Sequence, residues 1–383
     1  MDFNFTEEQE ILRRTARDFL AKEFPKTLVR EMEEDPIGFR ADIWKKMAEL
    51  GWMGLIIPED YGGVGGDFMD LIVLFEEMGR ACFIAPFFST VICTLPILSA
   101  GTEEQKKEFL PKIGRGEMIL SLALTEPSAT CDPSGITTKA LADKDGYVID
   151  GTKLFIHDAQ VAHCFLCATR TKTEGSLEDG ITLFLVDGRS PGIGIEVIPT
   201  VAHDKQCEVR FDGVRVPRDN VLGEVNRGWN IVEFIIQRGS VLKCAEMLGG
   251  VEAVLEMTNN YAKERVQFDK PIGSFQAIQH KLAQMLIEVE GLRYLTYEAA
   301  WHISTGIPSN LLVSMAKVRA NEVYQRTCLD GVKIHGAIGF TKELDLGLYF
   351  LRTKSSEFTL GGGGFHRERI ACELEQLQPP FLR

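Results

Sequence analysis

The stretch that decides the fold runs from residue 265 to residue 285 and has the sequence RVQFDKPIGSFQAIQHKLAQM. An arginine and a phenylalanine stand before a Pro-Ile-Gly turn, and an apolar stripe at helical spacing begins after it. The members of this stripe are Phe275, Ile278, Leu282, Met285 or Leu286, Val289 and Leu292. The pattern predicts one helix that ends at Arg265, a tight turn, and a second long helix.

The same helical period covers both ends of the chain. Ile231, Ile235, Leu242 and Leu248 predict the helix that precedes the turn, and long helices with few loops favour an antiparallel bundle over residues 226–383. Residues 1–120 are helical in period as well, with Thr6 as the N-cap of a first helix.

Between these regions the pattern changes to short apolar runs separated by Gly and Pro. Asp150-Gly151 is a hairpin signal. Residues 121–225 are therefore predicted to form a small β-barrel or β-sandwich domain. The expected fold class is α+β, with an N-terminal helical domain, a middle β domain and a C-terminal helical bundle.

Composition excludes several classes of function. The chain has 383 residues and a formal net charge of −13, which argues against a nucleic-acid surface. Its nine cysteines are scattered, and the pair Cys164 and Cys167 lies in a predicted buried strand, so core packing is favoured over a metal site. Residues 81–102 carry no charge, but two prolines and a glycine favour a buried helix over a membrane span. With no basic, apolar leader, a cytoplasmic protein is expected.

Further motifs extend over almost the whole chain. They are ELGWMGLIIPEDYGG (49–63), LALTEPSATCD (122–132), KLFIHDA (153–159) and KIHGAIGFTKE (333–343). Together with residues 265–285, and with the order α, β, α, they resemble the acyl-CoA dehydrogenase family. The resemblance implies that family's fold, in which the C-terminal domain is an antiparallel four-helix bundle, and FAD as the cofactor.

The resemblance also implies two groups of cofactor-binding residues. Leu124 and Thr125 would meet the pyrimidine end of the flavin ring, and Phe155 and His157 stand where the family has a Trp-Ile-Thr strand. A second group would bind from across a subunit interface: Arg265, which suits the diphosphate, with Phe268, Gln276, Lys333 and Gly336. Lys333 replaces a glutamine that is frequent in the family, and Gly336 permits close approach of the backbone.

The chain departs from the family at the residue that removes a substrate proton. Most members have a glutamate where this chain has Gly361, inside TLGGGGFHRERI. A glycine cannot take a proton, and its missing side chain would open space over the flavin. Some members carry the base near residues 237–240, but the sequence there is QRGS. Glu233, one helical turn earlier, is the nearest acid, and a solvated helix residue is its alternative reading.

Two more departures fall near the expected reaction centre. His157 replaces a threonine that donates a hydrogen bond to flavin N5, and it can either keep only that donor role or exchange a proton. Cys131 replaces the serine of a Gly-Ser-Asp motif, and a packing or ligand-contact role is favoured over a nucleophile. Arg238 and Gly361 are the other expected substrate contacts.

Three functions follow as hypotheses. The first is an FAD-dependent acyl-CoA dehydrogenase for a branched, cyclic or aromatic-derived acyl group, with Glu233 or His157 as a displaced base. The second is a non-redox lyase like the sulfinoacyl-CoA desulfinases, and the third is a catalytically degenerate subunit of a heteromeric enzyme. The expected partners are acyl-CoA, a second copy of the chain in a dimer or tetramer, and an electron-transferring flavoprotein.

Overall fold

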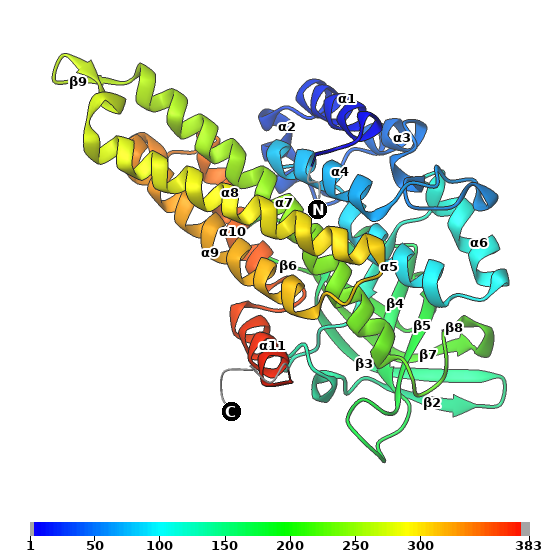
Figure 1. The fold of residues 1–383 in the computed structure, drawn as a ribbon. Helices are drawn as coiled ribbons and strands as arrows, with labels where there is room; N and C mark the ends of the chain where they lie inside the picture. Colours follow the sequence, from blue (N-terminus) through cyan, green and yellow to red (C-terminus); the bar gives the residue numbers. More distant parts are fainter. Residues whose placement is uncertain (1–3, 377–383) are drawn as a thin grey trace. The chain divides into compact units, whose positions relative to one another are not determined.

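The computed structural model describes residues 4–376, and Figure 1 shows the order of its elements. The described chain divides into two compact units. The helical unit comprises Met1–Arg30, Phe68–Phe83 and Gly239–Arg383, and the sheet unit comprises Glu31–Asp67 and Ile84–Arg238. The boundary between the units falls inside the longest helix, α7.

Helices account for both ends of the described chain. They are α1 (Glu7–Glu23), α2 (Lys26–Glu34), α3 (Ala41–Glu49), α4 (Phe68–Ala81), α5 (Phe87–Ala100), α6 (Glu103–Gly114), α7 (Trp229–Glu264), α8 (Gln276–Thr305), α9 (Asn310–His335), α10 (Leu346–Phe358) and α11 (Gly363–Gln376).

The first helix begins as the sequence predicts. The Thr6 hydroxyl accepts the Gln9 N–H at 3.2 Å, and the Gln9 side chain returns a bond to the Thr6 N–H at 3.1 Å. This capping box satisfies two N–H groups that a helix start leaves without partners. The uncharged run at residues 81–102 contains α5, which is almost entirely buried. Within residues 4–376, no helix has the length and apolar character that a membrane crossing requires.

The strands form one sheet and a small ribbon. They are β1 (Leu120–Ala123), β2 (Lys139–Asp143), β3 (Gly146–His157), β4 (Cys164–Arg170), β5 (Ile181–Asp187), β6 (Ile193–Ile198), β7 (Gln206–Pro217), β8 (Val221–Leu222), β9 (Val266–Gln267) and β10 (Lys270–Pro271). The sheet has the order β6-β7-β3-β2-β4-β5-β8, with β1 parallel to β4. Its core includes Phe165, Phe184 and Phe211, and Cys164 and Cys167 are buried in β4 as expected.

The predicted hairpin at Asp150-Gly151 is wrong. Both residues lie inside β3, and the turn between β2 and β3 is at residues 144–145. Gly151 is needed for a different reason: a Cβ there would lie 2.5 Å from the Thr138 hydroxyl oxygen and would clash with it. The pairing of β3 with β7 shifts at this point, so the glycine marks an irregularity within a strand.

Candidate active site and cofactor-binding residues

The segment after β1 is fixed by a buried ion pair that the sequence analysis did not identify. Glu126 and Lys153 are both buried, and Lys153 Nζ lies 2.8 Å from Glu126 Oε1. Lys153 Nζ also donates to the Leu124 carbonyl at 3.2 Å. The Leu154 N–H donates to the Thr125 carbonyl at 2.9 Å. These bonds hold the backbone of the Thr-Glu-Pro motif in one conformation.

The Glu126 carboxylate accepts further bonds from the N–H groups of Thr137 at 2.9 Å and Thr138 at 3.0 Å. Burial alone would raise the pKa of Glu126, but the charge and hydrogen bonds of Lys153 outweigh it and lower the pKa below its ordinary value. Thr125 beside it is half-buried. Among the residues that the structure describes, none bonds to its hydroxyl, which suits a group that meets a ligand.

Near the end of β3 the backbone turns the Phe155 side chain out of the regular strand pattern. The pairing with β7 shifts between Lys153 and Ile156, and Phe155 adopts a left-handed conformation with φ +57°. Its ring is 45% exposed. An exposed aromatic ring held at a bulge is a surface on which a flat ligand can pack.

His157 is the last residue of β3 and lies against α5 and the loop before β7. The Ser121 hydroxyl donates to the His157 carbonyl at 2.5 Å, and the His157 and Phe88 rings meet edge to face at 6.4 Å. Its Nδ1 lies 3.8 Å from Asp204 Oδ2. Asp204 was not identified from the sequence, because it stands 47 positions later and no motif contains it.

The Thr130-Cys131-Asp132 segment is a loop. Cys131 is half-buried, and the Asp132 carboxylate accepts the Ser134 N–H at 2.8 Å, which caps the short turn of residues 133–135. Asp132 therefore has a local structural role, and Cys131 stays a predicted ligand contact.

The beginning of α7 carries Glu233 and Arg238. Both are half-buried. The Arg238 guanidinium carbon lies 3.5 Å from the centroid of the Phe234 ring, and burial lowers the pKa of Arg238 to about 10. It still carries its charge at neutral pH. No carboxylate pairs with it in the described part of the chain, so it is a half-buried cation suited to an anionic or carbonyl oxygen.

The predicted turn between two long helices exists on the helical unit. After α7 the chain forms the β9–β10 ribbon, and α8 begins at Gln276 (Figure 1). The Ile272 N–H donates to the Arg265 carbonyl at 2.8 Å and closes the turn. Phe268, with φ +53°, is 87% exposed. Arg265 and Gln276 are exposed as well, so the ribbon offers a cation, an amide and an aromatic ring.

Lys333 and Gly336 lie at the C-terminal end of α9. Lys333 Nζ is 3.2 Å from Asp330 Oδ1, so this cation is already paired with an acid. Gly336 has φ +69°, and apart from its chain neighbours no atom of the described residues lies within 4 Å of the position of a Cβ. The backbone there is sterically open, and its contact with a ligand stays a prediction.

Gly361 does not open a space. It is buried with φ +107°, and a Cβ built on it would lie 2.3 Å from the nearest atom of the Phe365 ring. The expected opening is therefore wrong, because the first turn of α11 returns an aromatic ring onto this glycine. Because Gly361 precedes α11, the four-residue spacing of helical neighbours does not predict its contact with Phe365.

Two buried side chains, Lys317 and His366, form hydrogen bonds to the backbone that precedes Gly361. Lys317 Nζ donates to the Ser356 carbonyl at 2.7 Å and the Glu357 carbonyl at 3.1 Å. His366 Nε2 lies 3.2 Å from the Leu360 carbonyl oxygen, and burial, aided by the charge of Lys317, lowers the pKa of His366 to about 3. The neutral His366 ring thus donates to the carbonyl that precedes Gly361.

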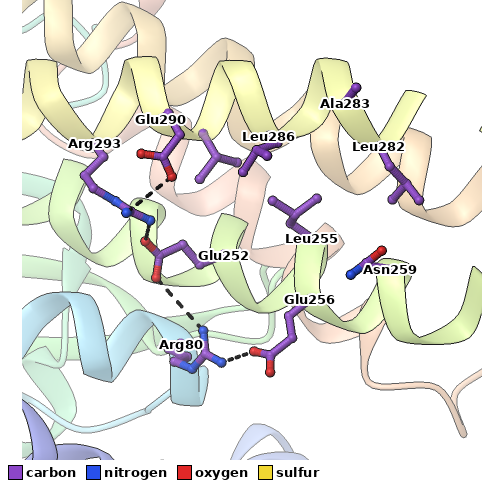
Figure 2. Close-up of a pocket in the computed structure, with 11 residues that line it drawn as sticks. Arg80, Glu252, Leu255, Glu256, Asn259, Leu282, Ala283, Leu286, Glu290 and Arg293 are labelled. Atoms are coloured by element: carbon purple, nitrogen blue, oxygen red, sulfur yellow. Dashed lines mark hydrogen bonds and ion pairs between the residues drawn. The ribbon is translucent and has the colours of Figure 1, made fainter. Parts of the chain in front are cut away.

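A separate groove of about 480 Å³ lies on the helical unit between α7 and α8. Figure 2 shows Arg80 and Arg293 bound there to Glu252, Glu256 and Glu290 beside a row of leucines. It contains none of the predicted site residues.

The described residues fit a flavin cofactor in chemical terms. Thr125 and His157 supply polar groups, Phe155 and Phe268 supply ring faces, and Arg265 supplies a cation without an acidic partner in the described chain. These are the functions that a flavin ring and a diphosphate require.

Comparison with known proteins agrees with this chemistry. Models of the acyl-CoA dehydrogenase N-terminal, middle and C-terminal domains match residues 6–117, 121–214 and 226–374. The probable acyl-CoA dehydrogenase YngJ of Bacillus subtilis is 34% identical over 98% of this chain and 100% of its own length. A 3-(aryl)acrylate reductase of Clostridium sporogenes is 33% identical over 88% of this chain and 91% of its own. The subunit CarC of the caffeyl-CoA reductase–Etf complex of Acetobacterium woodii is 34% identical over 88% and 90%.

Solved structures agree over nearly the full length. Butyryl-CoA dehydrogenase of Megasphaera elsdenii has a TM-score of 0.91 and 30% identity, covering 98% of this chain and 100% of that one. The FAD complex of PigA has a TM-score of 0.90 and 25% identity, covering 98% and 99%. The ChsE4–ChsE5 complex of Mycobacterium tuberculosis has a TM-score of 0.89 and 27% identity, covering 99% and 100%. The chain therefore belongs to the acyl-CoA dehydrogenase family, oxidoreductases that act on CH–CH groups, and its cofactor is FAD.

Proposed function

We propose that this chain is an acyl-CoA dehydrogenase-like enzyme that acts on a branched, cyclic or aromatic-derived acyl-CoA and takes the α-proton with a residue other than the family's usual glutamate. The observation that carries the proposal is Gly361, which is buried, left-handed and covered by Phe365. Neither residue can accept a proton, so the base has to come from another part of the chain.

The family reaction needs a base because the α-proton of a thioester is weakly acidic, and a positioned base contributes about 10²–10⁴-fold in rate. FAD supplies the acceptor for the β-hydride. Glu233 and His157 are the two proposed bases. Both belong to the sheet unit, which also carries Arg238 and Cys131, the proposed contacts of the acyl-CoA.

The cofactor would be shared between two copies of the chain. Leu124, Thr125, Phe155 and His157 of one copy serve the flavin ring, and the exposed ribbon of a second copy serves the diphosphate. The residues proposed for the second role are Arg265, Phe268, Gln276, Lys333 and Gly336. We place the protein in the cytoplasm as a dimer or tetramer that passes electrons to an electron-transferring flavoprotein.

The aromatic part of the substrate range is supported by relatives. One is named for 3-(aryl)acrylates and one for caffeyl-CoA. Both names specify substrates that carry an aryl substituent.

Anaerobic mixing of the FAD-loaded chain with a panel of acyl-CoAs tests the proposal. We expect loss of the oxidised flavin absorbance with at least one branched, cyclic or aryl-substituted thioester. Glu233→Gln should slow that loss by about 10²–10⁴-fold if Glu233 is the base, and Glu256→Gln, on an exposed part of the same helix, should leave it unchanged. No bleaching with any thioester would contradict the proposal.

A second candidate is a degenerate subunit of a heteromeric enzyme. The closed position 361 favours it, and one structural neighbour is a chain of the ChsE4–ChsE5 complex, which is named for two proteins. Turnover by the purified chain alone would exclude this role. A lyase of the desulfinase kind would instead form product without any electron acceptor.

A further inference from the structure

Beside the proposed flavin contact lies an arrangement that resembles an acid–base pair. His157 pairs with Gln206 across the β3–β7 ladder, and Asp204 stands two residues before Gln206. The register therefore places the Asp204 carboxylate next to the imidazole, with His157 Nδ1 3.8 Å from Asp204 Oδ2. The side chains are 26% and 12% exposed, so water screens the pair only in part.

The Asp204 carboxylate is itself held in place by neutral donors. The Gln206 amide donates to Oδ2 at 2.7 Å, and the Thr200 hydroxyl donates to Oδ1 at 2.6 Å. The backbone on both sides is fixed too, because Lys205 Nζ donates to the Glu33 carbonyl at 2.9 Å and the Asp158 N–H donates to the Lys205 carbonyl at 2.9 Å. A carboxylate with this support cannot easily turn away from the histidine.

The imidazole is confined from its other sides. Ser121 holds its backbone carbonyl and Phe88 meets its ring edge to face. Of the other charged groups nearby, Asp158 accepts the Ser89 hydroxyl at 2.7 Å, and Lys205 bonds to the Glu33 carbonyl. Asp204 is an acid that faces Nδ1 directly. A separation of 3.8 Å is longer than a hydrogen bond, and such contacts often tighten only when ligand binds.

We propose that Asp204 is a positioning residue that keeps the hydrogen of the neutral His157 ring on Nδ1, so that Nε2 is the nitrogen that meets flavin or substrate. This inference rests on the proposed function, which it deepens. With hydrogen on Nδ1, Nε2 has a lone pair and can take the α-proton. The resulting imidazolium is stabilised by the Asp204 carboxylate, which stays ionised, and its Nε2–H becomes a donor.

Nitrogen-15 NMR of the full chain with labelled histidine reads out this arrangement without any turnover. His157 is assigned by the signal that disappears in His157→Gln. At neutral pH the wild type should show hydrogen on Nδ1 of the neutral ring, and Asp204→Ala should move population to the form with hydrogen on Nε2. Asp143→Ala removes a carboxylate of β2 in the same sheet and should leave the signal unchanged. An unchanged tautomer in Asp204→Ala would overturn the proposal.

Flavin reduction then separates this inference from the proposed function. Asp204→Ala should slow reduction by the best acyl-CoA about 10-fold or more, with the rate partly recovered in Asp204→Glu. If Asp204→Ala shifts the His157 tautomer but no thioester reduces the flavin even in the wild type, the His157–Asp204 inference stands and the proposed function is contradicted. Unchanged reduction in Asp204→Ala would remove the catalytic part of the inference alone.

Discussion

At the scale of single residues, Gly361, where the resemblance places the family's base, is a tightly constrained glycine. Its φ of +107° is unfavourable for any L-residue with a side chain, and Phe365 fills the space beside it. The two costs are independent, because the first concerns the backbone of Gly361 and the second its neighbour. They can therefore be measured separately.

Gly361→Ala should lower the free energy of unfolding by about 2–5 kcal/mol, as the sum of left-handed strain and overpacking. Gly306→Ala is the matched control, since Gly306 has φ +74° and no atom within 4 Å of a Cβ. It should cost only the strain. Urea titration measures both, and adding Phe365→Leu to Gly361→Ala should recover part of the loss. Equal losses in the two alanine variants would contradict the steric part of this prediction.

The buried pair of Glu126 and Lys153 gives a prediction on the stability of variants that lack one or both charges. Lys153→Met should cost about 3–5 kcal/mol, because it leaves a buried carboxylate without its cation. The double variant with Glu126→Gln should cost less than the single one. Unfolding midpoints from urea titration compare the three proteins.

The pH dependence of this pair has a defined sign. The pKa of Glu126 is lower in the folded protein than its ordinary 4.5, so its ionised form stabilises the fold above that pH, and the contribution is lost as the pH falls through and below 4.5. Glu126→Gln should therefore show a smaller loss of stability between pH 6 and pH 3 than the wild type. An identical acid slope in both would be the contrary result.

At the scale of elements, the ribbon between α7 and α8 exposes an aromatic ring and a cation. Phe268 is left-handed and 87% exposed, and Arg265 beside it has no acidic partner in the described chain. A helical hairpin of this length could be closed by a simple polar turn. Its cationic and aromatic composition supports the proposed contact with FAD of a second copy of the chain.

Arg265→Ala should weaken FAD binding by about tenfold or more, since a charge-assisted bond contributes about 1.5–3 kcal/mol. Lys263→Ala removes a neighbouring exposed cation from the end of α7 and should have little effect. The ratio of flavin absorbance to protein absorbance after gel filtration measures the retained cofactor. Full retention in Arg265→Ala, with an unchanged oligomer, would argue against this use of the ribbon.

At the scale of the whole molecule, charged side chains join stretches of sequence that are far apart. In the helical unit, Arg13 of α1 bonds to Glu76 of α4, and the Tyr297 hydroxyl of α8 donates to Glu76 at 2.6 Å. Burial, and then the nearby charge of Glu252, raises the pKa of Glu76 to about 7, against the opposing effect of Arg13. Because the pKa of Glu76 lies near 7, the stability of the folded protein should change with pH between about 4.5 and 7.

The folded protein binds an extra proton at Glu76 between pH 4.5 and about 7, so this group's stabilisation is complete below 4.5 and is lost as the pH rises to 7. Glu76→Gln should therefore show a smaller fall of the melting temperature from pH 5 to pH 7.5 than the wild type. Glu77→Gln weakens the ion pair of Glu77 with Arg17, so it should lower the melting temperature at each pH but leave the fall between pH 5 and pH 7.5 unchanged. A fall of wild-type size in Glu76→Gln would contradict the assignment.

Local patterns predict most of this fold, and the failures have a common cause. The 3.6-residue period of the bundle helices and the capping residue Thr6 act within a few positions, so they are visible in sequence. The hairpin prediction at Gly151 fails because the glycine is required by contact with Thr138, which is distant in sequence. Asp204, Lys153 and Phe365 were missed for the same reason, since each matters through a side chain that folding brings to it. The motifs locate the proposed cofactor residues, but not what supports them.

The packing of Phe365 on Gly361 has a consequence for how such a chain can evolve. A lineage that exchanges the glutamate for glycine can go back by one mutation only while the vacated volume stays empty. Once an aromatic ring such as that of Phe365 fills this volume, a glutamate at position 361 would clash with it. Reversal then needs two mutations, and the first of them alone destabilises the protein. The exchange of glutamate for glycine then becomes effectively irreversible.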